Sequence, residues 1–242
     1  GVLADWGKPY LTMDHLTEAN IIRSLGKIIS SGHLAKGVKP VHWCIDCCSA
    51  LAEAEVEYND KQSPAIDVRF TVDESSQFFK KFNIENNVNS ISFVIWTTTP
   101  WTLPANQAVA VHPDNQYVFV HINDELLIIA NELCESVLSR FGFTDWEILH
   151  DCNGSELEGI KLKHPFYERI VPVVLANHVT LEAGTGVVHI APGHGQDDYT
   201  VGQNYNLLVD NPVADNGCFF EDTELFSGMF VFKANDSVIS VL

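Results

Sequence analysis

Apolar and polar side chains alternate along much of the chain after residue 50. The alternation is clearest in residues 54–58 and 66–72, where Val68 and Phe70 flank Arg69. Successive side chains of a β-strand point to opposite faces, so this pattern predicts strands with one buried face. Alternating or apolar runs predict further strands at residues 91–97, 107–111, 117–122, 126–130, 146–150, 170–175 and 185–190.

Helical spacing of apolar residues is clearest near the N-terminus. It predicts a helix over residues 14–31, which Asp14 can cap and Gly32 can end. A short strand is expected at residues 41–43. Short helices are expected at residues 75–82, 131–140 and 197–206. Many strands with few helices predict an α+β fold, mainly antiparallel β and barrel-like, with short peripheral helices and a helical N-terminal connector.

The composition is that of a folded domain, because hydrophobic residues make up 46% and charged residues 19% of the 242 residues. No apolar run approaches the ~20 residues that a membrane helix needs. The chain does not begin with Met or with a signal peptide, so we expect a piece of a longer protein. Six cysteines, unevenly spread, favour a reducing cytoplasmic location over a disulfide-stapled secreted domain.

The charge of the chain is strongly negative, −18 in total, and it is unevenly distributed. Residues 1–50 hold five Lys/Arg and four Asp/Glu, whereas residues 51–242 hold nine Lys/Arg and 28 Asp/Glu, a balance of −19. Such a surface repels phosphate backbones and lacks the usual footprint of a nucleic-acid binder. Any RNA that the chain handles must therefore be held mainly by something else.

The first segment with candidate chemistry is WTTTPWTLPAN, residues 96–106. An apolar strand leads into Thr97, Thr98 and Thr99, and Pro100 cannot continue a central strand. The three hydroxyls should therefore lie at a strand end, where they can bind a ribose, a carbonyl or a water. Threonine is also simply common in strands, so this segment alone does not establish a site.

The second segment is GTGVVHIAPGHGQDDY, residues 184–199. Its glycines and prolines permit tight turns, and Asp197 and Asp198 stand at the start of a helix. Capping and the helix dipole explain one carboxylate, and a second can bind a substrate ammonium group. His189 and His194 beside the aspartates suggest a metal site, but their spacing matches no standard zinc motif, so no metal is expected here.

Together the two segments resemble the inserted editing domain, CP1, of class I isoleucyl-tRNA synthetases. Residues 39–58, KPVHWCIDCCSALAEAEVEY, look like the entry into that insertion. The resemblance divides the chain into a connector from the catalytic domain at 1–50, an editing domain at 51–212 and a return segment toward the catalytic domain at 213–242. The related valyl and leucyl enzymes share the layout, but their threonine loops run into Arg-Pro and they lack the HG-x-DDY run.

The resemblance implies hydrolytic proofreading of valine misattached to tRNA(Ile), with valyl-adenylate as a further candidate substrate. Asp198 would anchor the α-ammonium group of the amino acid. Three residues would surround the scissile ester and the terminal adenosine: Thr97, Thr98 and Thr99. The residues that would form or support the pocket for the amino-acid side chain are Trp101, Thr102, His189 and Asn106. No side chain is an obvious general base, so catalysis would rest on positioning water and substrate.

The synthetase signatures His-Ile-Gly-His and Lys-Met-Ser-Lys-Ser do not occur in the sequence. We therefore expect a deacylase activity that forms part of an isoleucine–tRNA ligase, with ATP binding and aminoacylation elsewhere in the full-length enzyme. The expected partners are the 3′ end of tRNA(Ile) carrying valine and the rest of the synthetase, without a membrane. The isolated domain is expected to be a monomer.

Editing itself should need no cofactor. In many family members a Cys-x-x-Cys in the entry segment binds zinc together with a second such pair; here Cys44 and Cys47 match the first pair, and the second is missing from the sequence. A structural zinc site needs four ligands, so only an incomplete half-site is expected. Two alternatives remain open: a non-catalytic module that binds a tRNA 3′ end or an amino acid, and a structural zinc-binding connector centred on these cysteines.

Overall fold

The computed structural model describes residues 3–85 and 88–242, and the chain divides into two compact units, Gly1–Val38 and Lys39–Leu242. The first unit contains α1 (His15–Ser30), which confirms the helix predicted for residues 14–31. Its apolar side chains, including Leu16 and Ile22, are exposed, and none of its residues is buried. Neither α1 nor any other described helix is long and apolar enough to span a membrane.

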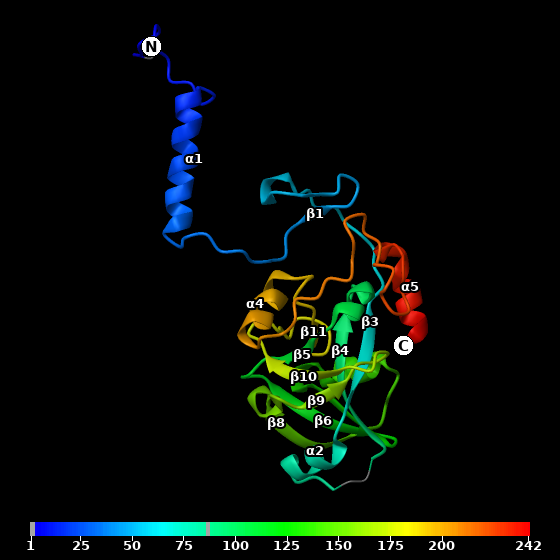
Figure 1. Cartoon of the computed structure of the whole chain (residues 1–242). Helices are drawn as coiled ribbons and strands as arrows, with labels where there is room; N and C mark the ends of the chain where they lie inside the picture. The colour runs from blue at the N-terminus through cyan, green and yellow to red at the C-terminus, as the bar shows by residue number, and fades with distance from the viewer. Residues whose placement is uncertain (1–2, 86–87) are drawn as a thin grey trace. The chain divides into compact units, whose positions relative to one another are not determined.

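The second unit is built on a nine-stranded sheet in the order β11-β5-β10-β9-β3-β4-β7-β6-β8 (Figure 1). Two neighbouring pairs, β4–β7 and β5–β10, are parallel, and the other neighbours are antiparallel. The strands are β3 (Ile66–Val72), β4 (Ser90–Thr97), β5 (Ala108–Val111), β6 (Gln116–Ile122), β7 (Glu125–Ala130), β8 (Glu147–Asn153), β9 (Lys161–Lys163), β10 (Ile170–Leu175) and β11 (Val187–Ile190).

The sheet curls but is not closed into a barrel. In the described part of the chain its order ends at β11 and β8, and no ladder joins these two strands. The curl nevertheless brings β11 against β4, and the N–H of Ala130, at the end of β7, donates to the carbonyl of Thr185, just before β11, at 2.9 Å. The mainly antiparallel α+β fold is thus confirmed, and the barrel-like shape is that of an open, curled sheet.

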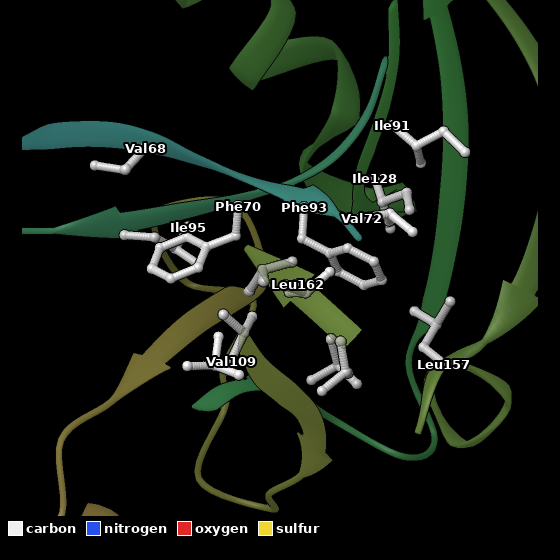
Figure 2. Packing of buried hydrophobic residues seen from close by; sticks show 14 of the residues in the cluster. Val68, Phe70, Val72, Ile91, Phe93, Ile95, Val109, Ile128, Leu157 and Leu162 are labelled. Carbon is white, nitrogen blue, oxygen red and sulfur yellow. The ribbon is translucent and has the colours of Figure 1, made fainter. Parts of the chain in front are cut away.

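The main core lies on the inner face of the curled sheet. Val68, Phe70 and Val72 project to this face from β3 and meet Ile91 and Phe93 of β4 (Figure 2). The alternation that predicted β3 therefore has the expected cause, since its buried residues are two positions apart. The other strands of the sheet also contribute to this core, and so do α2 (Ser75–Phe82), residues 219–226 and α5 (Val231–Val241).

Two further helices cover the outer face. Cys134, Val137 and Leu138 of α3 (Cys134–Arg140) pack on outward-facing residues of β4, β6 and β7. Val201 of α4 (Gln196–Asn204) packs on β5, β10 and β11. Because both faces of the central strands are covered, β4 and β5 are buried almost throughout, which explains why their sequences read as continuous apolar runs.

Some local predictions were wrong. Residues 54–58 form no strand: Glu53–Glu55 is a 3₁₀ turn (η1), and Tyr58 is 85% exposed, so the alternation there has no core to face. The strand expected at 41–43 is the two-residue β1 (Trp43–Cys44), paired with β2 (Ser49–Ala50). The structure also adds β9 and α5, which the pattern analysis missed. Three short 3₁₀ segments complete the list: η2 (Pro100–Ala105), η3 (Asn131–Leu133) and η4 (Gly154–Leu157).

The loop before β11 is tied to the sheet through a buried tyrosine. The Tyr117 hydroxyl donates to the Gly186 carbonyl at 2.7 Å and accepts from the His112 N–H at 2.9 Å. Gly186 has φ +72°, and a Cβ at this position would lie 2.3 Å from the Cβ of Ala130. Only glycine adopts this left-handed backbone conformation without strain and also leaves room for Ala130, so the loop can lie directly against β7.

Gly186→Ala should therefore lower the free energy of unfolding by about 2–5 kcal/mol, because a left-handed backbone costs ~1–2 kcal/mol and overpacking adds ~1–3 kcal/mol. Gly142→Ala is the matched control: its φ is +81° and nothing lies within 4 Å of the added Cβ. It should lose only the backbone cost, about 1–2 kcal/mol. Urea unfolding measures both, and equal losses would contradict the close approach to Ala130.

Candidate functional site

The threonine segment leaves the sheet at the end of β4, as the sequence predicted. Thr97 is the last residue of the strand and is buried, Thr98 is half-buried and Thr99 is exposed. The Thr97 hydroxyl oxygen accepts the Thr99 N–H at 3.1 Å and lies 3.4 Å from the Thr99 hydroxyl. The hydroxyls of Thr97 and Thr99 therefore lie together where the chain turns away from the strand.

The turn η2 connects this strand end to β11. The Thr102 hydroxyl lies 2.9 Å from the Thr99 carbonyl, to which it donates, and 3.1 Å from His189 Nε2. A hydroxyl has one proton, so the consistent assignment has His189 Nε2–H donating to Thr102. Nδ1 of His189 then carries a lone pair, and this buried atom has no hydrogen-bond partner among the described residues.

Burial keeps His189 and His194 uncharged. The pKa of His189 falls to about 4, first because the ring is desolvated and then because His194 and His164 lie nearby. Burial also lowers the pKa of His194 to about 4, against the opposing effect of Asp210. Both rings are neutral at neutral pH, which suits walls and hydrogen-bonding groups better than general bases.

The two neighbouring aspartates differ in exposure: Asp197 is exposed, and Asp198 is half-buried. Asp197 is exposed in the first turn of α4, whereas Oδ2 of Asp198 accepts the Ala191 N–H at 2.8 Å. Burial raises the pKa of Asp198, opposed by this hydrogen bond and by nearby His178. The hydrogen bond thus holds the carboxylate beside Ala191, which directly follows β11 and lies two residues after His189.

The structure links most of the predicted site residues through short contacts. A series of hydrogen bonds runs from Thr97 through Thr99 and Thr102 to His189, and Ala191 connects the same strand to Asp198.

Three predicted residues lie outside this series: Thr98, Trp101 on the turn η2, and Asn106 directly after it. The Trp101 ring meets His194 edge-on, with centroids 5.2 Å apart. Asn106 is fully buried; its Nδ2 donates to the Ala108 carbonyl at 2.8 Å, and its Oδ1 has no partner among the described residues. Trp101 is therefore in contact with the second motif, whereas Asn106 secures the passage from the turn into β5.

Three residues outside the two motifs also contact this turn and were missed in the sequence: His164, Arg169 and Asn235. All three bind backbone atoms of the turn. No side-chain pattern in the sequence signals such contacts, because the partner groups are common to every residue.

The cysteine pair forms a compact hairpin turn of its own. The N–H of Cys47 donates to the Cys44 sulfur at 3.3 Å, and this contact lowers the pKa of the Cys44 thiol. Across residues 3–85 and 88–242, no group of three or more His, Cys, Asp or Glu side chains is arranged to hold a metal. Two thiolates would be half of the four ligands that a tetrahedral zinc site needs.

Comparison with known proteins gives the family. A model of the class I tRNA synthetases (I, L, M and V) matches residues 1–231. Isoleucine–tRNA ligase of Nitrosococcus oceani is 60% identical over the whole chain, and that of Alkalilimnicola ehrlichii is 57% identical over the whole chain. The chain spans 26% of the length of either relative.

Solved structures match the fold. The editing domain of P. knowlesi cytosolic leucyl-tRNA synthetase superposes with a TM-score of 0.56 at 14% identity, covering 76% of this chain and 96% of that one. The corresponding P. falciparum domain gives a TM-score of 0.56 at 12% identity, covering 75% of this chain and 96% of that one. The chain therefore belongs to the class I tRNA synthetases, as a relative of the isoleucine–tRNA ligases with the fold of a CP1 editing domain.

Proposed function

We propose that this chain hydrolyses the ester of valine misattached to tRNA(Ile). The observation that supports this function most is the hydrogen-bonded series that joins the threonine end of β4 to His189 of β11, together with the Asp198 carboxylate bound to Ala191 just after β11. It combines hydroxyls suited to an ester and its ribose with a carboxylate suited to an ammonium group. The family and fold support it as well.

In this mechanism, Asp198 binds the α-ammonium group of the aminoacyl ester through a charge-assisted hydrogen bond. Thr97, Thr98 and Thr99 surround the ester and the terminal adenosine, and Thr99 helps to place the attacking water. Water adds to the ester carbonyl, the bond to the ribose oxygen breaks, and valine and a free tRNA hydroxyl leave. A neutral His189 with a pKa of about 4 is a weak base, so positioning carries most of the rate enhancement.

The need for such a second site is a limit on binding. Valine lacks one methylene of isoleucine, a difference worth about 1–3 kcal/mol in a pocket, which is the established magnitude for isoleucyl-tRNA synthetases themselves rather than a result of this structure. A site that admits valine and excludes isoleucine supplies further discrimination. In this proposal Trp101, Thr102 and His189 form the wall that excludes the larger side chain, and Asn106 supports the turn.

The acidic surface fits a domain that meets only the 3′ end of the tRNA. With a net charge of −18, the chain would repel a long phosphate backbone, and the rest of the synthetase would hold the tRNA body. We therefore expect the chain alone to bind tRNA weakly and with strong dependence on salt. The two partners of the chain in this proposal are the valine-bearing tRNA(Ile) end and the remainder of the enzyme.

The Asp198 carboxylate is tested by two variants. Asp198→Asn keeps an oxygen that can accept the Ala191 N–H but removes the charge, and Asp198→Ala removes both. Each should reduce the rate of valine release from valyl-tRNA(Ile) by about 30-fold or more, since losing one partner of a hydrogen-bonded charge pair costs ~2–5 kcal/mol and ~1.4 kcal/mol is tenfold. Asp197→Asn, at the exposed neighbour, is the control and should stay near the wild-type rate. Normal deacylation by Asp198→Asn would refute the role of the charge.

The pH dependence of deacylation follows from the same carboxylate. Its raised pKa means that the charge is lost at a higher pH than for an ordinary aspartate. Because only the charged form binds an ammonium group, kcat/KM for valyl-tRNA should be full at neutral pH and should fall on acidification through that raised pKa. Rates measured between about pH 4 and pH 7, corrected for spontaneous hydrolysis, test this. A flat profile down to the acidic limit would speak against Asp198.

The wall is tested by the discrimination between two esters. His189→Ala should admit the larger side chain, so hydrolysis of isoleucyl-tRNA should rise by roughly 10-fold or more relative to valyl-tRNA. His189→Gln, which keeps much of the volume and a donor for Thr102, is the matched variant and should retain more of the discrimination. If both variants discriminate as the wild type does, His189 does not border the side-chain pocket.

A further inference from the structure

The 3₁₀ turn η2 is held along its length by side chains from distant segments. Asn235, on α5, accepts the Trp101 N–H at 3.1 Å at the start of the turn. His164 Nε2 lies 3.0 Å from the Leu103 carbonyl in its middle. Arg169 occupies its end. The turn is thus attached to two elements that carry neither of the two motifs.

Arg169 makes the shortest of these contacts. Its Nη1 lies 2.6 Å from the Asn106 carbonyl and 3.4 Å from the Pro104 carbonyl. The guanidinium also lies over the Tyr167 ring, 5.5 Å from its centroid, and the Tyr167 hydroxyl donates to the Glu224 carbonyl at 2.8 Å. The cation is therefore held in place on one side and directed at backbone oxygens on the other.

Arg169 lies near several carboxylates but donates to backbone carbonyls instead. A cavity of about 580 Å³ beside the guanidinium is lined by four acidic residues: Glu168, Asp210, Asp222 and Glu224. Within the described residues Arg169 forms no ion pair with any of them, although the chain has only 14 Lys and Arg against 32 Asp and Glu. Its N–H groups donate to backbone carbonyls of the turn. The position of the Arg169 side chain is therefore not explained by a surface ion pair.

The chemistry of the turn accounts for this choice. The last carbonyls of a helical turn have no partner within it and favour a cation. Charge-assisted hydrogen bonds are shorter and about twice as strong as neutral ones, in agreement with the 2.6 Å contact. Arginine presents several donors in a rigid plane, so one side chain can serve two carbonyls at once.

His164 reinforces the same position from the neighbouring hairpin end. Its Nδ1 accepts the N–H groups of Phe166 and Tyr167, so Nε2 bears the proton and donates to Leu103. Burial lowers the His164 pKa to about 4, which keeps this tautomer neutral. The carbonyl of Arg169 accepts the His164 N–H at 2.9 Å, which joins the two holding groups to each other.

We infer that Arg169 is a positioning residue of the proposed editing site, acting through the backbone of η2. The turn that it holds at Pro104 and Asn106 carries Trp101 and Thr102 at its other end. A small displacement of Thr102 would shift its hydrogen bond to His189 and the wall between valine and isoleucine. The expected change in deacylation kinetics rests on the proposed function. The expected effect on the turn itself rests on the contacts alone.

The experiment compares Arg169→Met with Arg140→Met in the full 242-residue chain. Arg140 is the matched arginine, because it forms a two-point contact with Asp67 on the other side of the sheet, at 2.6 and 3.1 Å. Hydrogen exchange of residues 97–106 and steady-state deacylation of valyl- and isoleucyl-tRNA(Ile) are measured for both variants. Arg169→Lys, which keeps the charge and one group of donors, is the conservative variant.

Arg169→Met should speed amide exchange in residues 97–106 and leave β6 and β7 unchanged. It should lower kcat for valyl-tRNA by about 10- to 100-fold, with KM changed by less than roughly threefold, and reduce the preference for valyl over isoleucyl ester. Arg169→Lys should recover part of both effects, and Arg140→Met should show neither.

Unchanged exchange in residues 97–106 would overturn the inference, whatever the activity. A uniform rise in exchange over the whole chain would overturn it too, because Arg169 would then serve general stability. If the wild-type chain releases no valine, the proposed function fails, while the exchange data still decide whether Arg169 fixes the turn. Local exchange without any change in kcat or in ester preference would also contradict a positioning role.

Discussion

The hydrogen bond between Thr102 and His189 joins two segments that lie 87 residues apart in the sequence. Both side chains are buried, so neither could be left without a partner at low cost. The bond fixes the turn after β4 against β11. Ala191, which directly follows β11, donates its N–H to the Asp198 carboxylate. This buried contact thus connects the threonine segment to the strand that leads to the carboxylate.

That contact exists only because the sheet curls. β11 pairs with β5 at one end of the strand order, yet it packs against β4, which lies far along the sheet. The turn residues before β11 permit the approach: Gly184 rests on the Trp96 ring, and Gly186 fits against Ala130 where any Cβ would collide. Glycines that the sequence marks only as loop residues are therefore required for the close approach of these segments.

The sequence predicts what is local and misses what is long-range. The helix at 75–82 and the strand at 170–175 were predicted with the boundaries that the structure shows, because the pattern of apolar residues that predicts each one lies within its own segment. Residues 54–58 carry an equally good alternation and form no strand, since no neighbour offers them a ladder or a core. Motifs likewise made Thr97–Thr99 and Asp198 candidates, whereas the contact of Arg169 with the turn could not be predicted, because its partners are carbonyls, which every residue has.

The electrostatics of the site follow from burial rather than from the net charge. A chain of −18 offers an ammonium group many carboxylates, so a specific site needs one that is desolvated and held in position. Asp198 meets that requirement, and its raised pKa records the desolvation. The same burial keeps His189 and His194 neutral. Burial thus lowers the pKa of these histidines and raises that of Asp198, so the ammonium group of the proposed substrate would meet neutral histidines rather than positive charges.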